Sequence, residues 1–225
     1  MEIKPILFST EMVQAIKRGQ KTCTRRVIRP HYKKDEVGFR VVTNAHTGEF
    51  VRVEKIDENE SAIFADGTER EVFPPYNVGD ILWVRETWCK AHVEFGENPD
   101  GSDAQYLAQG DNRDLIVYKD DAISKGIGVD GVTWKPSIFM PHAAARIFLR
   151  VTDVRAERLQ DIECIATEGV TMLPADNKRD PRCYFTYLWD STIKKPDLQR
   201  YGWDANPWVW VIKFEKCERP KGWCE

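Results

Sequence analysis

The stretch that decides the fold is residues 16–26, which read IKRGQKTCTRR. An apolar stripe at helical spacing leads into it, formed by Met12, Ala15 and Ile16. With Thr10 as the expected N-cap, the pattern predicts a helix that runs to about Arg18 and ends at Gly19. The residues after the glycine predict a strand that carries Lys21, Thr24 and two arginines.

Positive charge is concentrated around this stretch. Residues 12–34 hold eight Lys or Arg and no acid, although the whole chain has a net charge of -3. Such a local excess favours a small anionic or nucleotide-like ligand. The acidic stretch from Asp57 to Asp130 argues against a protein that coats long duplex DNA, because that binding needs a broad basic face.

Composition indicates a folded protein rather than a disordered one. The chain has 225 residues, of which 42% are hydrophobic and 31% charged, and we expect one domain over residues 1–225. The N-terminus lacks the long apolar region of a secretory signal and no apolar run is long enough for a membrane span, so we expect a cytoplasmic protein with no membrane partner.

Metal and cofactor motifs are missing from the sequence. The six cysteines include no CxxC pair, and the four histidines lie far from any pair of cysteines in sequence. There is also no P-loop, dinucleotide fingerprint or HExxH motif. We therefore expect no metal site and no cofactor.

Hydrophobic patterning predicts an α+β fold of several short strands with few helices. The strands are expected at residues 5–9, 39–43, 50–54, 61–65, 69–73, 81–85, 147–154 and 208–214. Helices are expected at residues 162–168, capped by Asp161, and at 181–193, with Tyr184, Leu188 and Tyr187 facing inward. Residues 90–135 are polar, with one strand-like piece at 115–119, and are interpreted as an inserted arm.

Asp80 follows Gly79 immediately before the strongest strand pattern in the chain, at residues 81–85. An aspartate at this position favours a tight turn, because its carboxylate accepts backbone hydrogen bonds. We expect a structural role for Asp80.

Taken together, the motifs resemble the ASCH domain, which belongs to the PUA-like β-barrel superfamily. The resemblance covers nearly the whole chain and rests on residues 19–25 (GQKTCTR), 78–84 (VGDILWV), 159–169 and 208–214. Phage and prophage ASCH-containing proteins are the most similar in detail, through residues 85–88 (RETW), 134–141 (WKPSIFMP) and 201–210 (YGWDANPWVW). The resemblance implies a small PUA-like β-barrel with peripheral helices and a long inserted arm.

The resemblance also implies recognition of RNA, a nucleotide or a modified nucleoside. One branch of the family hydrolyses the amide of N4-acetylcytidine with a Lys, a Thr and a later Glu from a helix, which correspond here to Lys21, Thr24 and Glu168. A neutral Lys21 would deprotonate Thr24 or a water, and Glu168 would protonate the departing amine. The alternative is that Lys21 and Glu168 form an ordinary ion pair and Thr24 is a plain strand residue.

Ligand-binding candidates flank these positions. Arg25 and Arg26 alternate along the strand, so one of them is expected to point inward and contact a phosphate or carbonyl. Trp83 and Trp88 are candidates for stacking a base, with packing in the core as the alternative. A non-catalytic RNA-binding or phage accessory module would instead use an open groove lined by Lys17, Arg18, Arg25, Arg26 and Arg29.

Overall fold

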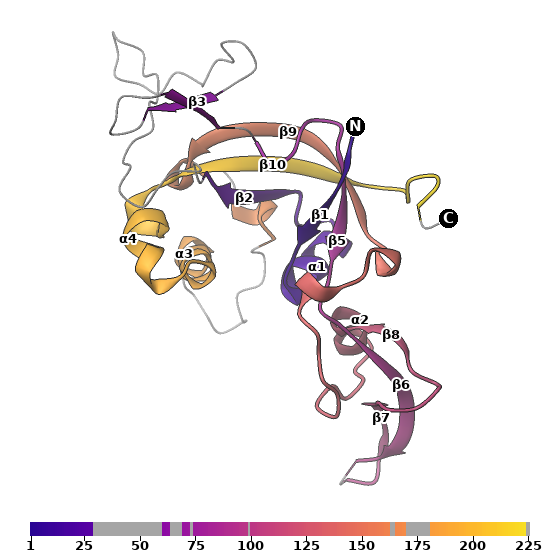
Figure 1. Ribbon diagram of the computed structural model, residues 1–225. Helices are drawn as coiled ribbons and strands as arrows, with labels where there is room; N and C mark the ends of the chain where they lie inside the picture. Colours follow the sequence, from indigo (N-terminus) through magenta and orange to yellow (C-terminus); the bar gives the residue numbers. More distant parts are fainter. Residues whose placement is uncertain are drawn as a thin grey trace. The chain divides into compact units, whose positions relative to one another are not determined.

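The computed structural model describes residues 1–28, 60–63, 69–72, 74–98, 100–162, 165–169 and 181–223, and its ribbon is drawn in Figure 1. The strands expected at 39–43 and 50–54 lie outside these residues. The described part is α+β, as predicted, with mixed sheets and few helices. None of its helices combines the length and the apolar character needed to cross a bilayer.

The chain divides into two compact units. The first consists of Met1–Thr22, Gly79–Arg150 and Glu215–Glu225, and the second of Cys23–Val78 and Val151–Phe214. The single domain expected over residues 1–225 stays a prediction.

Strand β5 (Ile81–Arg85) is the central strand of the first unit. It lies parallel to β1 (Ile3–Leu7) and antiparallel to the start of β9 (Phe148–Arg158). Its first four residues are buried, as expected for a strand covered on both faces.

Helix α1 (Thr10–Lys17) begins one residue earlier than predicted. Ser9 is the N-cap, and its hydroxyl accepts a hydrogen bond from the Met12 amide, so the assignment of this role to Thr10 was wrong. Val13 rather than Met12 joins the buried stripe, together with Ala15 and Ile16. The helix ends as predicted, because Gly19 takes a φ of 73°.

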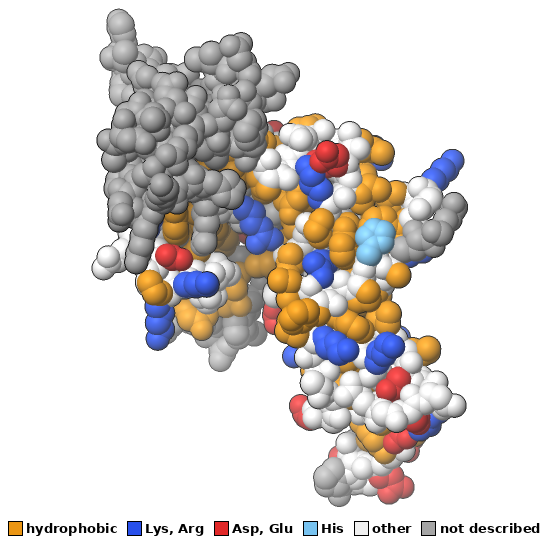
Figure 2. Space-filling view, in the orientation of Figure 1, with side chains coloured by type: hydrophobic (Ala, Val, Ile, Leu, Met, Phe, Trp, Pro, Cys, Tyr) orange, Lys and Arg blue, Asp and Glu red, His pale blue; other side chains and the backbone are white. Residues whose placement is uncertain are grey.

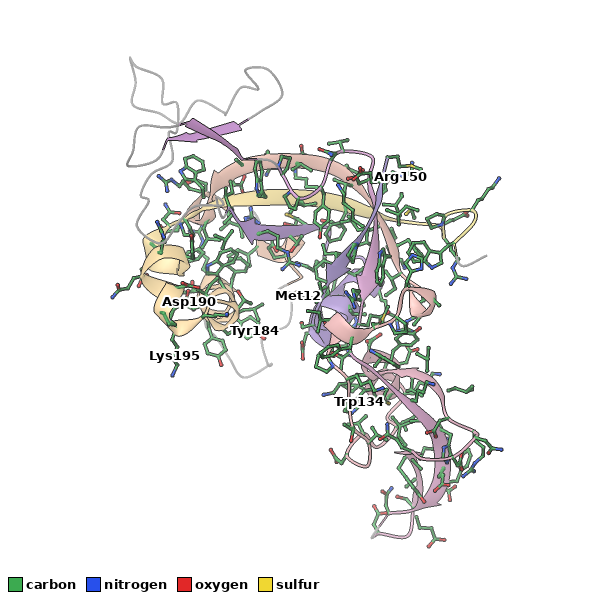
Figure 3. The ribbon with its side chains drawn as sticks, in the orientation of Figure 1. Met12, Trp134, Arg150, Tyr184, Asp190 and Lys195 are labelled. Carbon is green, nitrogen blue, oxygen red and sulfur yellow. The ribbon has the colours of Figure 1, made fainter. Side chains whose placement is uncertain are left out.

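The inserted arm, defined here as residues 88–135, is more ordered than the sequence suggested. It contains β6 (Trp88–Glu97), β7 (Asp103–Ala108), β8 (Leu115–Tyr118) and helix α2 (Lys119–Ser124). A small core of its own lies between them, formed by Cys89, Ala91, Leu107 and Ala122, with Trp134, labelled in Figure 3, packed against it.

The three strands of the arm are staggered. Strand β6 lies between its two partners, but β8 pairs only with its first four residues and β7 only with its last six. Each long edge of β6 is therefore covered over part of its length.

After the arm, two short 3₁₀ turns, η1 (Ser137–Phe139) and η2 (His142–Ala144), lead to β9. They help to enclose a hydrophobic cluster that contains Trp83, Trp88, Met140 and Phe148. The C-terminal segment returns to this cluster, where Trp223 is buried and its ring stacks on His142 at a centroid distance of 3.5 Å.

In the second unit, β2 (Cys23–Val27) pairs antiparallel with β10 (Trp208–Cys217), and β3 (Glu60–Ile63) with β4 (Glu69–Val72). The β3–β4 pair confirms the strands predicted at 61–65 and 69–73.

The prediction of an α-helix over residues 162–168 is wrong. The chain instead makes the 3₁₀ turns η3 (Leu159–Asp161) and η4 (Ile165–Thr167). Helix α3 (Pro181–Thr192) follows, and then come the short turns η5 (Lys195–Asp197), α4 (Leu198–Tyr201) and η6 (Trp203–Ala205).

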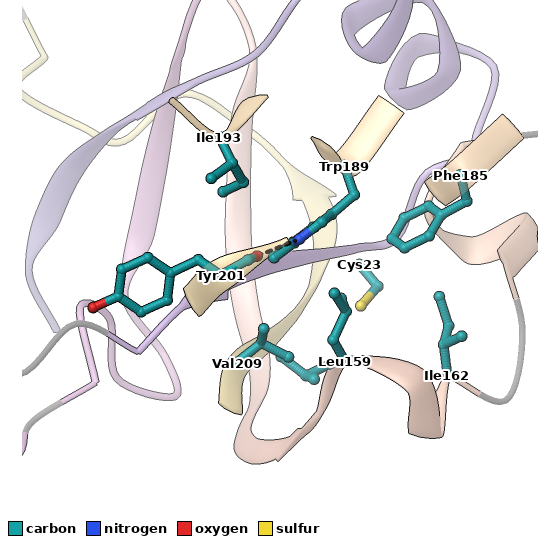
Figure 4. Packing of buried hydrophobic residues seen from close by; sticks show 9 residues of the cluster. Cys23, Leu159, Ile162, Phe185, Trp189, Ile193, Tyr201 and Val209 are labelled. Atoms are coloured by element: carbon teal, nitrogen blue, oxygen red, sulfur yellow. Dashed lines mark hydrogen bonds between the residues drawn. The ribbon is translucent and has the colours of Figure 1, made fainter. Parts of the chain in front are cut away.

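Helix α3 buries a different face from the predicted one. Phe185 and Trp189 point into the hydrophobic cluster drawn in Figure 4, and the Trp189 indole donates a hydrogen bond to the Tyr201 carbonyl at 2.8 Å. Tyr184, labelled in Figure 3, and Tyr187 are exposed instead, and Leu188 is partly buried as predicted.

Hydrogen-bonded neighbours in the main sheet follow the order β1-β5-β9-β10-β2, while β3-β4 and β7-β6-β8 form separate sheets. This order has two ends, so the strands that the structure describes do not make a closed barrel.

Asp80 accepts a backbone hydrogen bond, as predicted, but the donor is distant in sequence and lies just before β1. Its carboxylate accepts from the Glu2 amide at 2.8 Å and from the Lys4 ammonium at 3.1 Å, and so joins β1 to the start of β5.

Asp80→Ala should lower the free energy of unfolding by about 2–3 kcal/mol, because a charged acceptor with two donors is lost. Urea denaturation measures this loss.

The matched variant Asp80→Asn keeps an acceptor for the Glu2 amide and should cost about 1 kcal/mol. If Asp80→Asn kept the melting temperature of the wild type but abolished turnover of a ligand, the structural role assigned to Asp80 would be wrong.

The described cysteines differ in reactivity. Cys183 is exposed, whereas Cys89 is fully buried and burial raises the pKa of its thiol to about 11. Because the thiolate is the nucleophile, a shift of this size alone lowers the reactive fraction about a hundredfold at pH 8. Iodoacetamide should therefore modify Cys183 first and leave Cys89 unmodified until the protein unfolds, as read by peptide mass spectrometry. Equal labelling of both thiols in the folded protein would contradict the burial of Cys89.

Candidate functional site

Strand β2 divides the residues of the motif between two sides of the sheet. Side chains alternate along a strand, so Cys23 and Arg25 share one side while Thr24 and Arg26 share the other. Arg25 is buried and Arg26 is exposed, so one arginine points inward, as the alternation predicts.

The guanidinium of Arg25 lies between two carboxylates of the second unit. Its Nη1 donates to Glu168 Oε1, and its Nη2 donates to Glu157 Oε1 on β9 at 2.5 Å. Glu168 Oε1 also accepts from the Cys23 thiol at 3.4 Å. Burial works to lower the pKa of Arg25, but the charges of Glu168, Cys23 and Glu157 outweigh it and raise this pKa. Arg25 therefore stays cationic inside the protein.

A row of charges on β9 connects this buried pair to solvent. Glu157 Oε2 accepts from Arg155 Nε at 3.1 Å, and Arg155 Nη1 donates to Asp153 at 2.7 Å. The side chains become more exposed along the row, from 5% at Arg25 and 15% at Glu157 to 43% at Asp153. One polar atom in this row lacks a hydrogen bond. The buried Nε of Arg25 has no partner among the described residues.

Glu168 follows the turn η4 and precedes Gly169, which takes a φ of 80°. The expected placement of Glu168 on an α-helix was wrong, because the described residues before it, 165–167, form a 3₁₀ turn. Its carboxylate nevertheless reaches Arg25, so the structure brings together two of the predicted site residues.

The other two residues proposed for catalysis are Thr24, in the second unit, and Lys21, in the first. Thr24 is buried on the opposite side of β2 from Arg25. Lys21 belongs to the first unit, where its amide donates to the Ala15 carbonyl at 3.1 Å and its ammonium lies 5.7 Å from the centre of the Phe8 ring. The convergence of Lys21 with Thr24 and Glu168 stays a prediction.

Trp83 and Trp88 are both buried in the hydrophobic cluster of the first unit. This burial agrees with core packing, the alternative to base stacking. A cation lies over each ring, Arg85 at 5.3 Å from that of Trp83 and Lys135 at 4.9 Å from that of Trp88. Their proposed stacking on a base stays a prediction.

Seven polar or charged residues are buried in the part of the chain that the structure describes. Three of them form ion pairs outside the motif, namely Asp80 with Lys4, Glu86 with Arg146, and Asp120 with Lys17. The other four are Lys21, Thr24, Arg25 and Glu168. All four are residues that the sequence singled out as site candidates.

Sequence reasoning missed Cys23 and Glu157 as partners in this cluster. For Glu157 a signal was present, because Asp153, Arg155 and Glu157 alternate in charge at the two-residue period of a strand.

Comparisons of the chain with protein-family models, with curated proteins and with solved structures find no match.

Arg25→Ala should lower the free energy of unfolding by about 3–5 kcal/mol, because it leaves the buried carboxylate of Glu168 without its counter-ion. The matched change Arg26→Ala alters the next position, whose side chain is exposed at the surface although burial lowers the pKa of its guanidinium, and it should cost less, because Glu168 keeps Arg25 as its buried counter-ion. Chemical denaturation of both variants gives the comparison.

The double variant Arg25→Ala with Glu168→Gln tests whether the carboxylate of Glu168 causes the loss of stability in Arg25→Ala. It should be more stable than Arg25→Ala alone, because the neutral amide removes the unpaired charge. Equal losses for Arg25→Ala and Arg26→Ala would show that the buried ion pair contributes nothing.

Proposed function

We propose that this chain is an ASCH protein of the PUA-like superfamily that recognises a nucleotide, a modified nucleoside or a short RNA. In its leading form it hydrolyses the amide of a modified base such as N4-acetylcytidine. The observation that carries the proposal is the burial of four motif residues: Lys21, Thr24, Arg25 and Glu168 are only 3%, 4%, 8% and 5% exposed.

Burial of such residues supports a functional role because it is costly. An ionised side chain loses several kcal/mol of hydration when it is buried, and ion pairing repays this cost only with good geometry. A protein keeps such groups inside for chemistry or for a structural ion pair. The pair of Arg25 with Glu168 fits both purposes, because it would also hold the carboxylate of Glu168 in one orientation.

The proposed chemistry assigns one step to each residue. Lys21, as the neutral amine, takes a proton from the Thr24 hydroxyl or from a water, whose oxygen then attacks the acyl carbon of the amide. The proton that Lys21 has taken passes to the carboxylate of Glu168, which gives it to the departing amine as the bond from the acyl carbon to the exocyclic nitrogen breaks. Where Thr24 is the nucleophile, a water then hydrolyses the ester that it has formed. Arg25 holds Glu168 in position throughout.

The pattern of burial favours an enclosed small ligand over an open RNA groove. Of the cations that would line such a groove, Arg25 is buried between two carboxylates, and Lys17 is paired with Asp120 at 2.6 Å and with Asp121 at 2.8 Å. These two charges already have anionic partners within the protein.

Lys21→Ala should remove hydrolysis of an amide-bearing nucleoside with little loss of stability, because a buried functional lysine costs the fold more than it contributes. Thr24→Val should act likewise, because it deletes the hydroxyl and keeps the branched shape. Glu168→Gln should keep ligand binding and slow turnover by about two to four orders of magnitude. Mass spectrometry of reactions with a panel of acylated nucleosides measures all three.

Glu157→Gln is the matched control for Glu168→Gln. It weakens the same arginine's ion pairing but removes no proposed proton donor, so turnover should stay within about tenfold of the wild type. Equal losses of turnover in both variants would assign the effect to Arg25 rather than to proton transfer. A crystal structure of a nucleoside complex that holds Lys21 away from Glu168 would overturn the enzymatic form.

The second candidate is the non-catalytic RNA-binding or phage accessory module, which the run of basic residues 12–34 favours. It predicts no turnover of any modified nucleoside by the wild type and similar losses of RNA binding in the three variants. Binding should then weaken with salt at a shallow slope of only a few phosphates, because the basic stretch is short.

A further inference from the structure

A group of three metal-ligating side chains lies in the arm, within the first unit. The ring of His92 on β6 faces Asp111 and Asp114, which come from the turn between β7 and β8. One ligand atom from each residue lies within 4.8 Å of the other two. We propose that His92, Asp111 and Asp114 form a binding site for a divalent transition-metal ion such as Zn²⁺.

The spacing of the ligand atoms is close to what such an ion needs. Two ligands of a tetrahedral ion lie about 3.4 Å apart when each metal–ligand distance is about 2.1 Å. The Nδ1 of His92 is 3.5 Å from Asp111 Oδ1 and 2.7 Å from Asp114 Oδ1. The first spacing already fits, and the second must open by about 0.7 Å, which a rotation of one carboxylate provides.

The backbone of the turn holds both carboxylates in place. Asp114 Oδ2 accepts a hydrogen bond from the Gly110 amide at 2.9 Å, which leaves Oδ1 directed at the imidazole. Asp111 Oδ1 accepts from the Arg113 amide at 2.7 Å and still lies near the ring. The ligands therefore need little ordering when an ion binds.

The second nitrogen of the imidazole has the partner that a metal-bound histidine usually has. Glu94 Oε1 lies 3.3 Å from Nε2 of His92, and Glu94 is itself held by Arg113 at 3.0 Å. Asp114 and Glu94 raise the pKa of His92 in the metal-free protein, so an ion that binds Nδ1 releases a proton from it while Glu94 continues to accept the Nε2 proton.

Charge and access are also compatible with a cation. With a neutral imidazole, the three carboxylates and the single guanidinium leave two negative charges, which match a divalent ion. Figure 2 shows acidic side chains on the surface of the arm. The His92 side chain is only 9% exposed, but Asp111 is 38% exposed, so an ion can enter from the side of Asp111 and keep water on its open positions.

One nitrogen with two carboxylate oxygens suits Zn²⁺ better than Mg²⁺, because imidazole is a poor ligand for Mg²⁺. Bound in this way, the ion would join β6 to the turn before β8.

The test uses the full chain without an affinity tag. Isothermal titration with ZnCl₂ in excess Mg²⁺ should show one ion per chain, confirmed by elemental analysis of the dialysed protein. His92→Phe and Asp114→Asn should each weaken binding at least tenfold, and Glu94→Gln by about 10–100-fold. The matched control Asp100→Asn alters another carboxylate of the same arm, which accepts from Ser102, and should leave the affinity unchanged.

A Co²⁺ titration separates this site from the thiols. Nitrogen and oxygen ligands give weak visible bands, and these should disappear in His92→Phe and remain in Asp100→Asn. An intense thiolate-to-cobalt band would assign binding to a cysteine and overturn the proposal, as would a wild type that takes up no Zn²⁺. If the circular dichroism spectrum shows that His92→Phe does not fold, the variant Asp111→Asn, at an exposed position, replaces it. An unchanged Zn²⁺ affinity of Asp111→Asn would overturn the proposed site.

Discussion

The buried guanidinium of Arg25 is the interaction on which the second unit depends. It contacts a residue of β9 and the residue that follows η4, so one side chain joins three segments that are distant in sequence. Because both partners are carboxylates, the charge of the arginine is neutralised where water is excluded. Cys23, which contacts Glu168, also belongs to the hydrophobic cluster of Phe185 and Trp189, so the polar and apolar parts of this interior meet at β2.

A second set of charges plays the corresponding part in the first unit. Arg146 donates to Glu86 through two nitrogens, at 2.9 Å and 2.7 Å, and its guanidinium lies 3.7 Å from the centre of the Tyr118 ring. It also contacts Asp121 of α2, which in turn pairs with Lys17 of α1. The base of the arm is therefore attached to α1 and to the end of β5 by ion pairs. Part of the positive charge that the sequence concentrates near residue 17 serves this attachment rather than a ligand.

Local signals predicted local features well. Gly19 ended its helix because few other residues adopt a positive φ readily, and residues 81–85 formed a strand because a continuous apolar run suits burial on both faces. The spacing of Ile162 and Ile165 also suited a helix, but the chain makes 3₁₀ turns there, which a pattern of apolar residues cannot distinguish from an α-helix. The polar residues of the arm concealed strands that pair with each other around a core of only four buried residues.

The site was predictable to the extent that its residues lie in one motif. Lys21, Thr24 and Arg25 are close in sequence and could be named from it as one motif, whereas the contact of Glu157 with Arg25 depends on the register of a strand more than a hundred residues later. The same reason explains why the sequence did not indicate the group formed by His92, Asp111 and Asp114. Asp114 lies 22 residues after His92, and only the turn between β7 and β8 brings the two together. Contacts of this kind follow from strand pairing, which sequence spacing does not contain.

The stagger of the arm has a consequence for solubility. On the edge of β6 that faces β8, residues 92–97 have no strand partner in the described part of the chain, and such an edge is a template on which a second molecule can add a strand. The other edge is covered further, because Lys135 pairs with Trp88 and the Gln109 side chain donates to the Lys90 carbonyl. Phe95, 77% exposed, would strengthen such an association. Glu94 and Glu97 lie on the same strand, so two copies that met along this edge would bring like charges together. The acidic residues of this strand therefore disfavour the addition of a second copy along its open edge.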